Sequence, residues 1–403
     1  MANQAAPAQT QGISATAAVA IAASLFAAIA WSILAVTDTD RSAITLGWSN
    51  KDFANYWIAA RLTLQGAVGE VFSAHEVYFA HMQAMFGPDY PWHAWSYPPH
   101  YLWTILPVGL LDYKSALIAY LLATFLLFCA SIRTAAPYAT PRQWLFLLPA
   151  VATNAIATQN GFLTSALVLI GLASRYNRPI LAGLCIGLLT VKPQLGLLLP
   201  LLLLYERRWL VIMVASLTAL GLAMASVAAF GLSTWRGYIE HVAPYMTDVM
   251  RYGTGIFLHM MPSVYGSARS LELSSDVATA VHFPVALISL CLWFLSLKRL
   301  QSDWARAAST IFATFVISPY SLSYDLIALA SVAALWPLPG ANPPGKALRA
   351  SLFAVAIMPI LMPVLGLSGW PIASLLIPLA WLLLMRSEAA SSPSLRHRQP
   401  SAL

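Results

Sequence analysis

The stretch LAGLCIGLLTVKPQLGLLLPLLLLY, residues 181–205, is apolar almost throughout and is interrupted near its middle by the pair Lys192-Pro193. Proline lacks the N–H that an α-helix needs at interior positions, so the stretch predicts two short helices joined by a turn. Segments that are apolar on every side are buried in a protein interior or in a membrane. We therefore expect a hairpin within a membrane, with Lys192 at its tip.

The composition of the whole chain supports a membrane protein. Of 403 residues, 59% are hydrophobic and only 9% are charged, whereas a soluble domain has about 25% charged residues. The net charge of +7 comes from Lys and Arg scattered between apolar segments, which is typical of topology determinants and not of a nucleic-acid-binding surface. Cys129, Cys185 and Cys291 all lie in apolar segments, so we interpret them as packing residues. The predicted class is an all-α polytopic membrane protein.

The apolar segments predict about 12 transmembrane helices. The first runs from about Thr16 to Val36; a cleaved signal peptide is the alternative, which the absence of a preceding Lys or Arg disfavours. The others lie near residues 113–132, 143–157, 161–174, 179–191, 193–205, 208–231, 279–297, 304–318, 325–337, 350–366 and 370–386. Several are shorter than the roughly 20 residues of a full span, which favours tilted or half-membrane helices around a cavity.

The placement of charge predicts the orientation. With a cytoplasmic N-terminus, every short inner connection carries Lys or Arg, as at Arg175, Arg207 and Lys298, and this follows the positive-inside rule. The outer side then receives two long loops, 37–112 and 232–278. To keep this orientation, the apolar stretch from His100 to Leu111 must lie on the outer leaflet as an interfacial helix. We expect one membrane domain over residues 1–390 and a disordered cytoplasmic tail over 391–403.

Polar residues from distant connections map to the predicted outer face. Asp52 follows the first helix among aromatic residues and suits a general base, although Asp is also common as a helix N-cap. Lys192 is a cation in an apolar run, which suits pairing with a phosphate or snorkelling to the interface. Gln159 and Asn160 form a polar tip that suits either a sugar site or a plain turn.

Four further candidates lie in later connections. Tyr320 and Tyr324 can stack on a sugar or bond to it, and they precede Asp325, whose position is equally explained by helix capping. His259 lies in the second loop, where a lone histidine is more often structural. A carboxylate base together with a cation is what inverting sugar transfer from a lipid phosphate requires: the base deprotonates the acceptor, and the cation stabilises the leaving phosphate.

The same residues lie in stretches that resemble the polyprenyl-phosphate-mannose-dependent mannosyltransferases of glycosyltransferase family 87, which have a C-type glycosyltransferase fold. The matching stretches are DFANYWIAARL (52–62), WSYPP (95–99), QNG (159–161), TVKP (190–193), SPY (318–320) and YDL (324–326). The resemblance implies that Asp52 is the catalytic base and that the donor is a polyprenyl-phosphate sugar. It adds Tyr56 and Arg61, from the first stretch, to the candidate donor-binding residues.

We therefore expect an inverting hexosyltransferase of the cell (plasma or inner) membrane, with both termini in the cytoplasm and the active site on the outer (extracytoplasmic) face. Mannose is the expected sugar, and a glycolipid or glycan is the expected acceptor. No metal is expected because no second acid adjoins Asp52, and neither a cofactor nor a nucleic-acid partner is expected. A transporter or flippase of a lipid-linked sugar, or a non-catalytic scaffold, is the alternative; a transporter would be expected to show internal repeats, which the sequence lacks.

Overall fold

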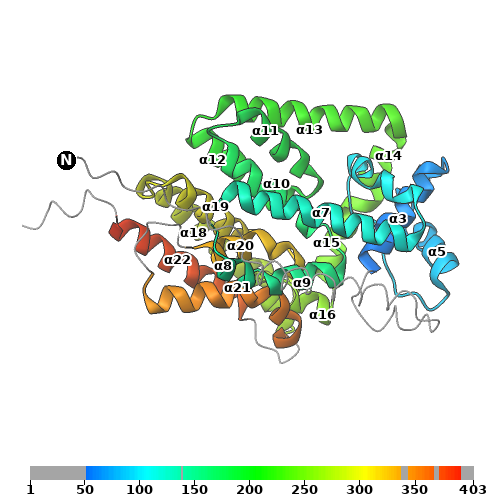
Figure 1. Cartoon of the computed structure of the whole chain (residues 1–403). Coiled ribbons are helices and arrows are strands. Elements are labelled where there is room, and N and C mark those ends of the chain that lie inside the picture. Colours follow the sequence, from blue (N-terminus) through cyan, green and yellow to red (C-terminus); the bar gives the residue numbers. More distant parts are fainter. Residues whose placement is uncertain (1–50, 138, 337–343, 367–371, 392–403) are drawn as a thin grey trace, which may run out of the picture.

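The computed structural model describes residues 51–391 apart from residue 138 and residues 337–343 and 367–371. Within this part of the chain every regular element is a helix (Figure 1). The predicted first span at Thr16 to Val36 and the tail beyond Ser391 lie outside the described residues.

Each apolar segment predicted beyond residue 112 contains a helix. The structure has α7 (Tyr113–Ala135), α8 (Pro141–Phe146), α9 (Leu148–Ala157), α10 (Gly161–Ser174), α11 (Pro179–Leu188), α12 (Leu199–Tyr205), α13 (Trp209–Phe230), α18 (Ser275–Arg299), α19 (Asp303–Ile317), α20 (Ile327–Leu335), α21 (Lys346–Gly366) and α22 (Ala373–Ser391). Among the described residues, three of these helices are long and apolar enough to cross a membrane, namely α7, α13 and α18. These helices indicate a membrane protein, and the count of twelve spans stays a prediction.

The turn predicted at Lys192-Pro193 is present. Helix α11 ends at Leu188, and two 3-10 turns, η3 (Leu189–Val191) and η4 (Pro193–Gly196), lead into α12. Helix α11 packs closely on α13 because glycines face that helix. A Cβ added at Gly187 would lie 2.5 Å from the Thr218 Cβ, and one at Gly183 would lie 2.5 Å from the Val214 Cβ. Small residues four apart let two helix backbones approach, as in membrane helix pairs.

The described part of the first loop is a packed helical unit. It contains α3 (Lys51–Leu64), α4 (Val68–Val71) and α5 (His75–Phe86), and its side chains Tyr78 and Trp95 are fully buried. The stretch from His100 to Leu111 does not form the single interfacial helix that we expected. It breaks into η1 (Pro99–Tyr101), α6 (Leu102–Ile105) and η2 (Leu106–Leu110). Pro107 interrupts the helix, and Gly109 lies so close to α3 that an added Cβ would be 2.9 Å from the Ala60 Cβ.

The second loop packs against the first. It contains α14 (Leu232–Gly237), a π-helical turn η5 (Tyr238–Val242), α15 (Ala243–Tyr252), α16 (Ile256–His259) and α17 (Val264–Ser270). Gly237 lies against the backbone of Phe72, where an added Cβ would be 2.2 Å from the carbonyl oxygen. Helices α3, α5 and α14 therefore group at the same end of the molecule (Figure 1).

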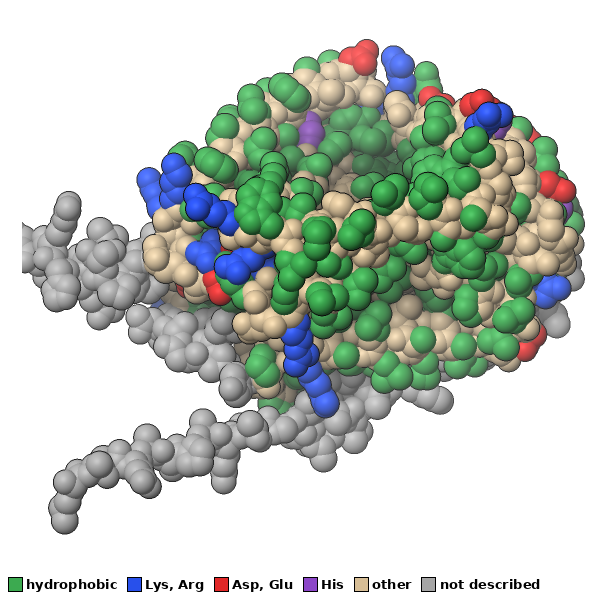
Figure 2. Space-filling view, turned by 90° about the horizontal axis from the view of Figure 1, so that it is seen from above, with side chains coloured by type: hydrophobic (Ala, Val, Ile, Leu, Met, Phe, Trp, Pro, Cys, Tyr) green, Lys and Arg blue, Asp and Glu red, His purple; other side chains and the backbone are tan. Residues whose placement is uncertain are grey.

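A cluster of charges joins three other connections. Glu206, between α12 and α13, accepts hydrogen bonds from Arg175 Nε at 2.7 Å and from Arg306 Nε at 2.9 Å. Arg175 also donates to the backbone oxygen of Asp303 at 2.8 Å. Three of the connections predicted to lie on the cytoplasmic side thus meet at one place. In Figure 2 hydrophobic side chains are spread over much of the visible face, and one group of Lys and Arg side chains lies toward its left end.

Candidate active site

A cavity of about 420 Å³ lies between the two loops and the helix ends beneath them. Six of the residues predicted for the site line this cavity. They come from the first loop and from connections far apart in the sequence: Asp52, Gln159, Lys192, Tyr320, Tyr324 and Asp325. Its volume falls within the range of about 300–1,000 Å³ that is typical of small-molecule sites. The structure therefore gathers most of the polar candidates around a single space.

Asp52 lies in the first turn of α3 and contacts His93. The distance from His93 Nε2 to Asp52 Oδ1 is 3.2 Å, and 21% and 19% of the two side chains are exposed. The neighbouring Asn55 fixes this arrangement, because its Nδ2 donates to the Ala94 carbonyl at 3.2 Å and its Oδ1 accepts from the Tyr78 hydroxyl at 2.6 Å. Helix α3 is thus fastened to the segment that carries His93.

Lys192 and Asp325 form a buried ion pair in the cavity wall. Lys192 Nζ lies 2.6 Å from Asp325 Oδ1, with 8% and 1% of the side chains exposed. Asp325 Oδ2 also accepts the Leu322 N–H at 3.0 Å, and the Lys192 ammonium lies 5.1 Å from the centre of the Tyr324 ring. A buried charge is tolerated when it is paired and hydrogen-bonded, as both members are here. The pair keeps an ammonium group facing the cavity.

Gln159 belongs to a network of tyrosine hydroxyls. Its Oε1 accepts from the Tyr56 hydroxyl and, at 3.2 Å, from the Tyr97 hydroxyl, and the two hydroxyls lie 2.9 Å apart. Burial raises the pKa of Tyr56 and of Tyr97 well above the usual tyrosine range. Both hydroxyls therefore stay protonated and can donate. The network makes a rigid polar wall with Gln159 and Tyr97 facing the cavity.

Four of the predicted residues are not among those that line the described cavity. Tyr56 is fully buried behind Gln159, and Asn160 is fully buried with its Nδ2 donating to the Tyr101 hydroxyl at 3.3 Å. Arg61 stacks on Trp57, with its guanidinium 4.8 Å from the ring centre. His259 ends α16, and its neighbour Phe257 reaches the cavity instead. Tyr56 and Asn160 support the wall, and Arg61 and His259 lie elsewhere.

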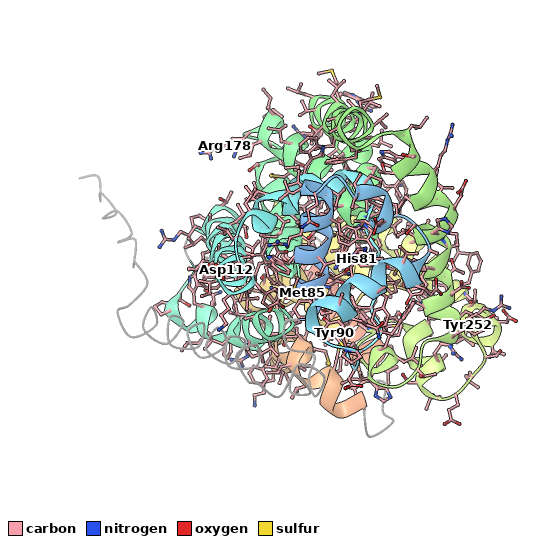
Figure 3. All side chains as sticks on the ribbon, turned by 90° about the vertical axis from the view of Figure 1, so that its right-hand side faces the viewer. His81, Met85, Tyr90, Asp112, Arg178 and Tyr252 are labelled. Carbon is pink, nitrogen blue, oxygen red and sulfur yellow. The ribbon has the colours of Figure 1, made fainter. Side chains whose placement is uncertain are left out.

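Helix α15 forms the opposite wall and is attached to the first loop. Tyr245, Met246 and Met250 of this helix line the cavity. The Tyr245 hydroxyl accepts from Trp92 Nε1 at 2.7 Å, and its ring lies 4.2 Å from the His75 ring. Seen from this end in Figure 3, the first loop occupies the centre and Tyr252, at the end of α15, lies at the rim.

Lys192 is the one lysine or arginine among the described residues that line the cavity, and Asp52 and Asp325 are the carboxylates. Asp325 is paired with Lys192, whereas Asp52 contacts His93. The cavity therefore has a carboxylate that can act as a base, at Asp52, and a cation, at Lys192. His93, Tyr97 and Tyr245 were not singled out from the sequence, although Tyr97 and Trp95 fall in the WSYPP stretch.

Comparison with known families supplies the class of protein. The sequence pattern of glycosyltransferase family 87 matches residues 95–319, which is more than half of the chain. The chain belongs to glycosyltransferase family 87. Neither the curated proteins nor the solved structures contain a match to it.

The family 87 match includes Tyr97, Gln159 and Lys192 and the whole of α15, whereas Asp52 lies before the matched range and Asp325 after it. A family 87 protein is a glycosyltransferase, so this chain uses a sugar donor and an acceptor. The cavity that these residues line is the natural candidate for the place where the two substrates meet.

Proposed function

We propose that this glycosyltransferase is an inverting enzyme that moves a hexose from a polyprenyl-phosphate sugar to a glycolipid or glycan on the outer face of the cell membrane. Mannose is the sugar that the resemblance favours. The observation that carries the proposal is the meeting of Asp52 and Lys192 at one cavity of about 420 Å³.

The chemistry follows from the two groups. The acceptor hydroxyl oxygen attacks the anomeric carbon on the face opposite the phosphate, and the bond between that carbon and the phosphate oxygen breaks. The hydroxyl proton passes to the Asp52 carboxylate, and the electron pair of the broken bond stays on the phosphate, which gains one negative charge. Asp52 acts as the general base and the Lys192 ammonium stabilises the developing charge.

The remaining polar lining suits a sugar. Gln159 and Tyr97 present a side-chain amide and a hydroxyl, and Tyr320 and Tyr324 present aromatic rings to the same space. Aromatic faces and fixed hydrogen-bonding groups are what orients a small polar ligand in a largely apolar site. Asp325 holds Lys192 in place, so its role in the proposal is to position the cation.

The orientation rests on the positive-inside rule. The cluster of Arg175, Glu206 and Arg306 joins connections rich in Lys and Arg, which favours a cytoplasmic position for that end. The residues of the cavity come from the connections that alternate with these. The proposed active site therefore faces outward.

The test is the turnover of the purified Asp52→Asn variant with a polyprenyl-phosphate sugar. The variant keeps the size of the side chain and loses its basicity, so kcat is expected to fall by roughly 10²- to 10⁴-fold while the donor still binds. Asp89→Asn is the matched control, since Asp89 is an exposed acid of the same loop. Turnover of Asp52→Asn at the wild-type rate would refute the assignment of the base.

A further inference from the structure

The proposed reaction leaves a proton on Asp52 at each turnover, and that proton must leave before the next cycle. His93 is the side chain in contact with this carboxylate: its Nε2 lies 3.2 Å from Asp52 Oδ1. This separation is within the range over which a proton passes between two groups. Nothing in the transfer step itself uses the imidazole.

We propose that His93 is a proton-relay residue that returns Asp52 to its carboxylate form; this inference rests on the proposed function. After transfer, the Asp52 carboxylic acid gives its proton to the Nε2 lone pair of neutral His93 in the tautomer that carries its own proton on Nδ1. The products are the Asp52 carboxylate and the His93 imidazolium, and water then takes a proton from the imidazolium. Exchange of the ring protons with water restores the Nδ1–H tautomer, and one proton has passed from the acceptor hydroxyl to the solvent.

The direction of the first step follows from general chemistry, because imidazole is a stronger base than a carboxylate. His93 also lies on the route to solvent. About a fifth of its side chain is exposed, and the preceding Trp92 is 47% exposed, so this part of the segment borders the solvent.

The other titratable groups of the cavity are poorly suited to this task. They are Tyr97, Lys192, Tyr238, Tyr245, Tyr320, Tyr324 and Asp325. The ion pair of Lys192 and Asp325 engages both of its members. Neutral phenols are very weak bases, and burial raises the pKa of Tyr97, which keeps that hydroxyl protonated. Tyr90, whose charge would interact with that of Asp52, is held neutral by burial, which raises its pKa.

A purely orienting role for His93 makes a different prediction. Neutral imidazole can donate an N–H to the Asp52 carboxylate and fix its rotamer, and a glutamine side chain can donate in the same way. Glutamine cannot accept a proton from a carboxylic acid. The two roles therefore separate in the variants His93→Gln and His93→Ala.

The experiment measures kcat and donor KM of both variants with a polyprenyl-phosphate sugar, with and without added imidazole. We expect His93→Ala to lose about 10²-fold in kcat with little change in KM, and imidazole to restore turnover in proportion to its unprotonated fraction. His93→Gln is expected to stay slow. His81→Ala is the matched control, because His81 pairs with Glu70 and is not among the cavity residues; its kcat should match the wild type.

Wild-type kcat in His93→Gln would overturn the relay, and so would a failure of imidazole to restore His93→Ala. Asp52→Asn measured alongside separates this inference from the proposed function. If Asp52→Asn is inactive while both His93 variants turn over normally, only the relay fails. If Asp52→Asn turns over normally, the proposed base itself is wrong. Should His93→Ala fail to fold, His93→Gln still decides the question.

Discussion

Replacing Lys192 by methionine is expected to destabilise the fold because Asp325 would be left buried without its cation. The pair is close, at 2.6 Å, and only 1% of the Asp325 side chain is exposed. After the change, the Asp325 side chain keeps one described hydrogen bond, from the Leu322 N–H at 3.0 Å. Breaking a buried ion pair from one side costs about 3–5 kcal/mol.

The cost converts into a measurable shift of the melting temperature. For a chain of 403 residues, the entropy of unfolding on the scale of soluble proteins is about 0.85 kcal/mol/K. Lys192→Met is therefore expected to lower Tm by about 4–6 °C. Replacing both members, as in Lys192→Met/Asp325→Leu, removes the unpaired charge, and such replacements are often neutral or stabilising. The double variant is expected to melt between the wild-type temperature and about 5 °C above it.

The assay is thermal unfolding of the detergent-purified proteins, followed by transfer activity of the same samples. The double variant is informative because it separates folding from function: it should be stable and yet inactive, since no ammonium faces the cavity. A wild-type Tm for Lys192→Met would refute the buried pair. Wild-type transfer by the stable double variant would refute the role of Lys192 at the phosphate.

Three other expectations concern stability and orientation. Burial raises the pKa of Glu206, but hydrogen bonds from Arg175, Tyr176 and Arg306, together with the charge of Arg175, outweigh burial and hold the pKa below the ordinary 4.5. The stability that this lowered pKa contributes is therefore complete above pH 4.5 and is lost as pH falls through the pKa of Glu206 in the folded protein. The Tm of the wild type should drop more steeply than that of Glu206→Gln between pH 6 and pH 3. Parallel curves of Tm against pH would contradict this. Gly187→Ala should cost about 1–3 kcal/mol, because its Cβ would meet Thr218. Gly221→Ala, which meets nothing within 4 Å, is the control, and equal Tm values would show that the α11–α13 contact is looser than described. In a cysteine-free background, an impermeant maleimide should label Glu272→Cys in intact cells and Arg178→Cys only after permeabilisation, since both positions are exposed; the reverse pattern would invert the topology.

The positions of the helices could be predicted from the sequence because apolar runs and prolines determine them locally. The turn at Lys192-Pro193 is one example. The segment 143–157 was expected to be a single helix and is instead divided between α8 and α9, with Pro149 near the start of α9. Proline at that position lacks the N–H that would continue the preceding helix, so the break between α8 and α9 could be predicted from the position of Pro149.

Part of the cavity lining could be predicted, because six residues assigned to one membrane face by charge placement line the same cavity. The pairing of Lys192 with Asp325 was not predictable, since these residues are 133 positions apart and hydropathy carries no information on distances between side chains. His93 has no distinguishing spacing, and only its contact with Asp52 marks it. Arg61 and His259 were chosen because they lie in a motif or a loop, and neither is among the described residues that line the cavity.

We propose that Asp52 and Lys192 together carry out the transfer of a sugar from a lipid phosphate. The most direct test of this proposal reconstitutes the purified protein with polyprenyl-phosphate-mannose and native membrane lipids and follows both products by mass spectrometry. We predict that the wild type releases free polyprenyl phosphate and forms one new mannosylated product in equal amounts, and that Asp52→Asn forms at most about 1% as much of either in the same time. An intact donor with the wild type, or wild-type amounts of product from Asp52→Asn, would contradict the account.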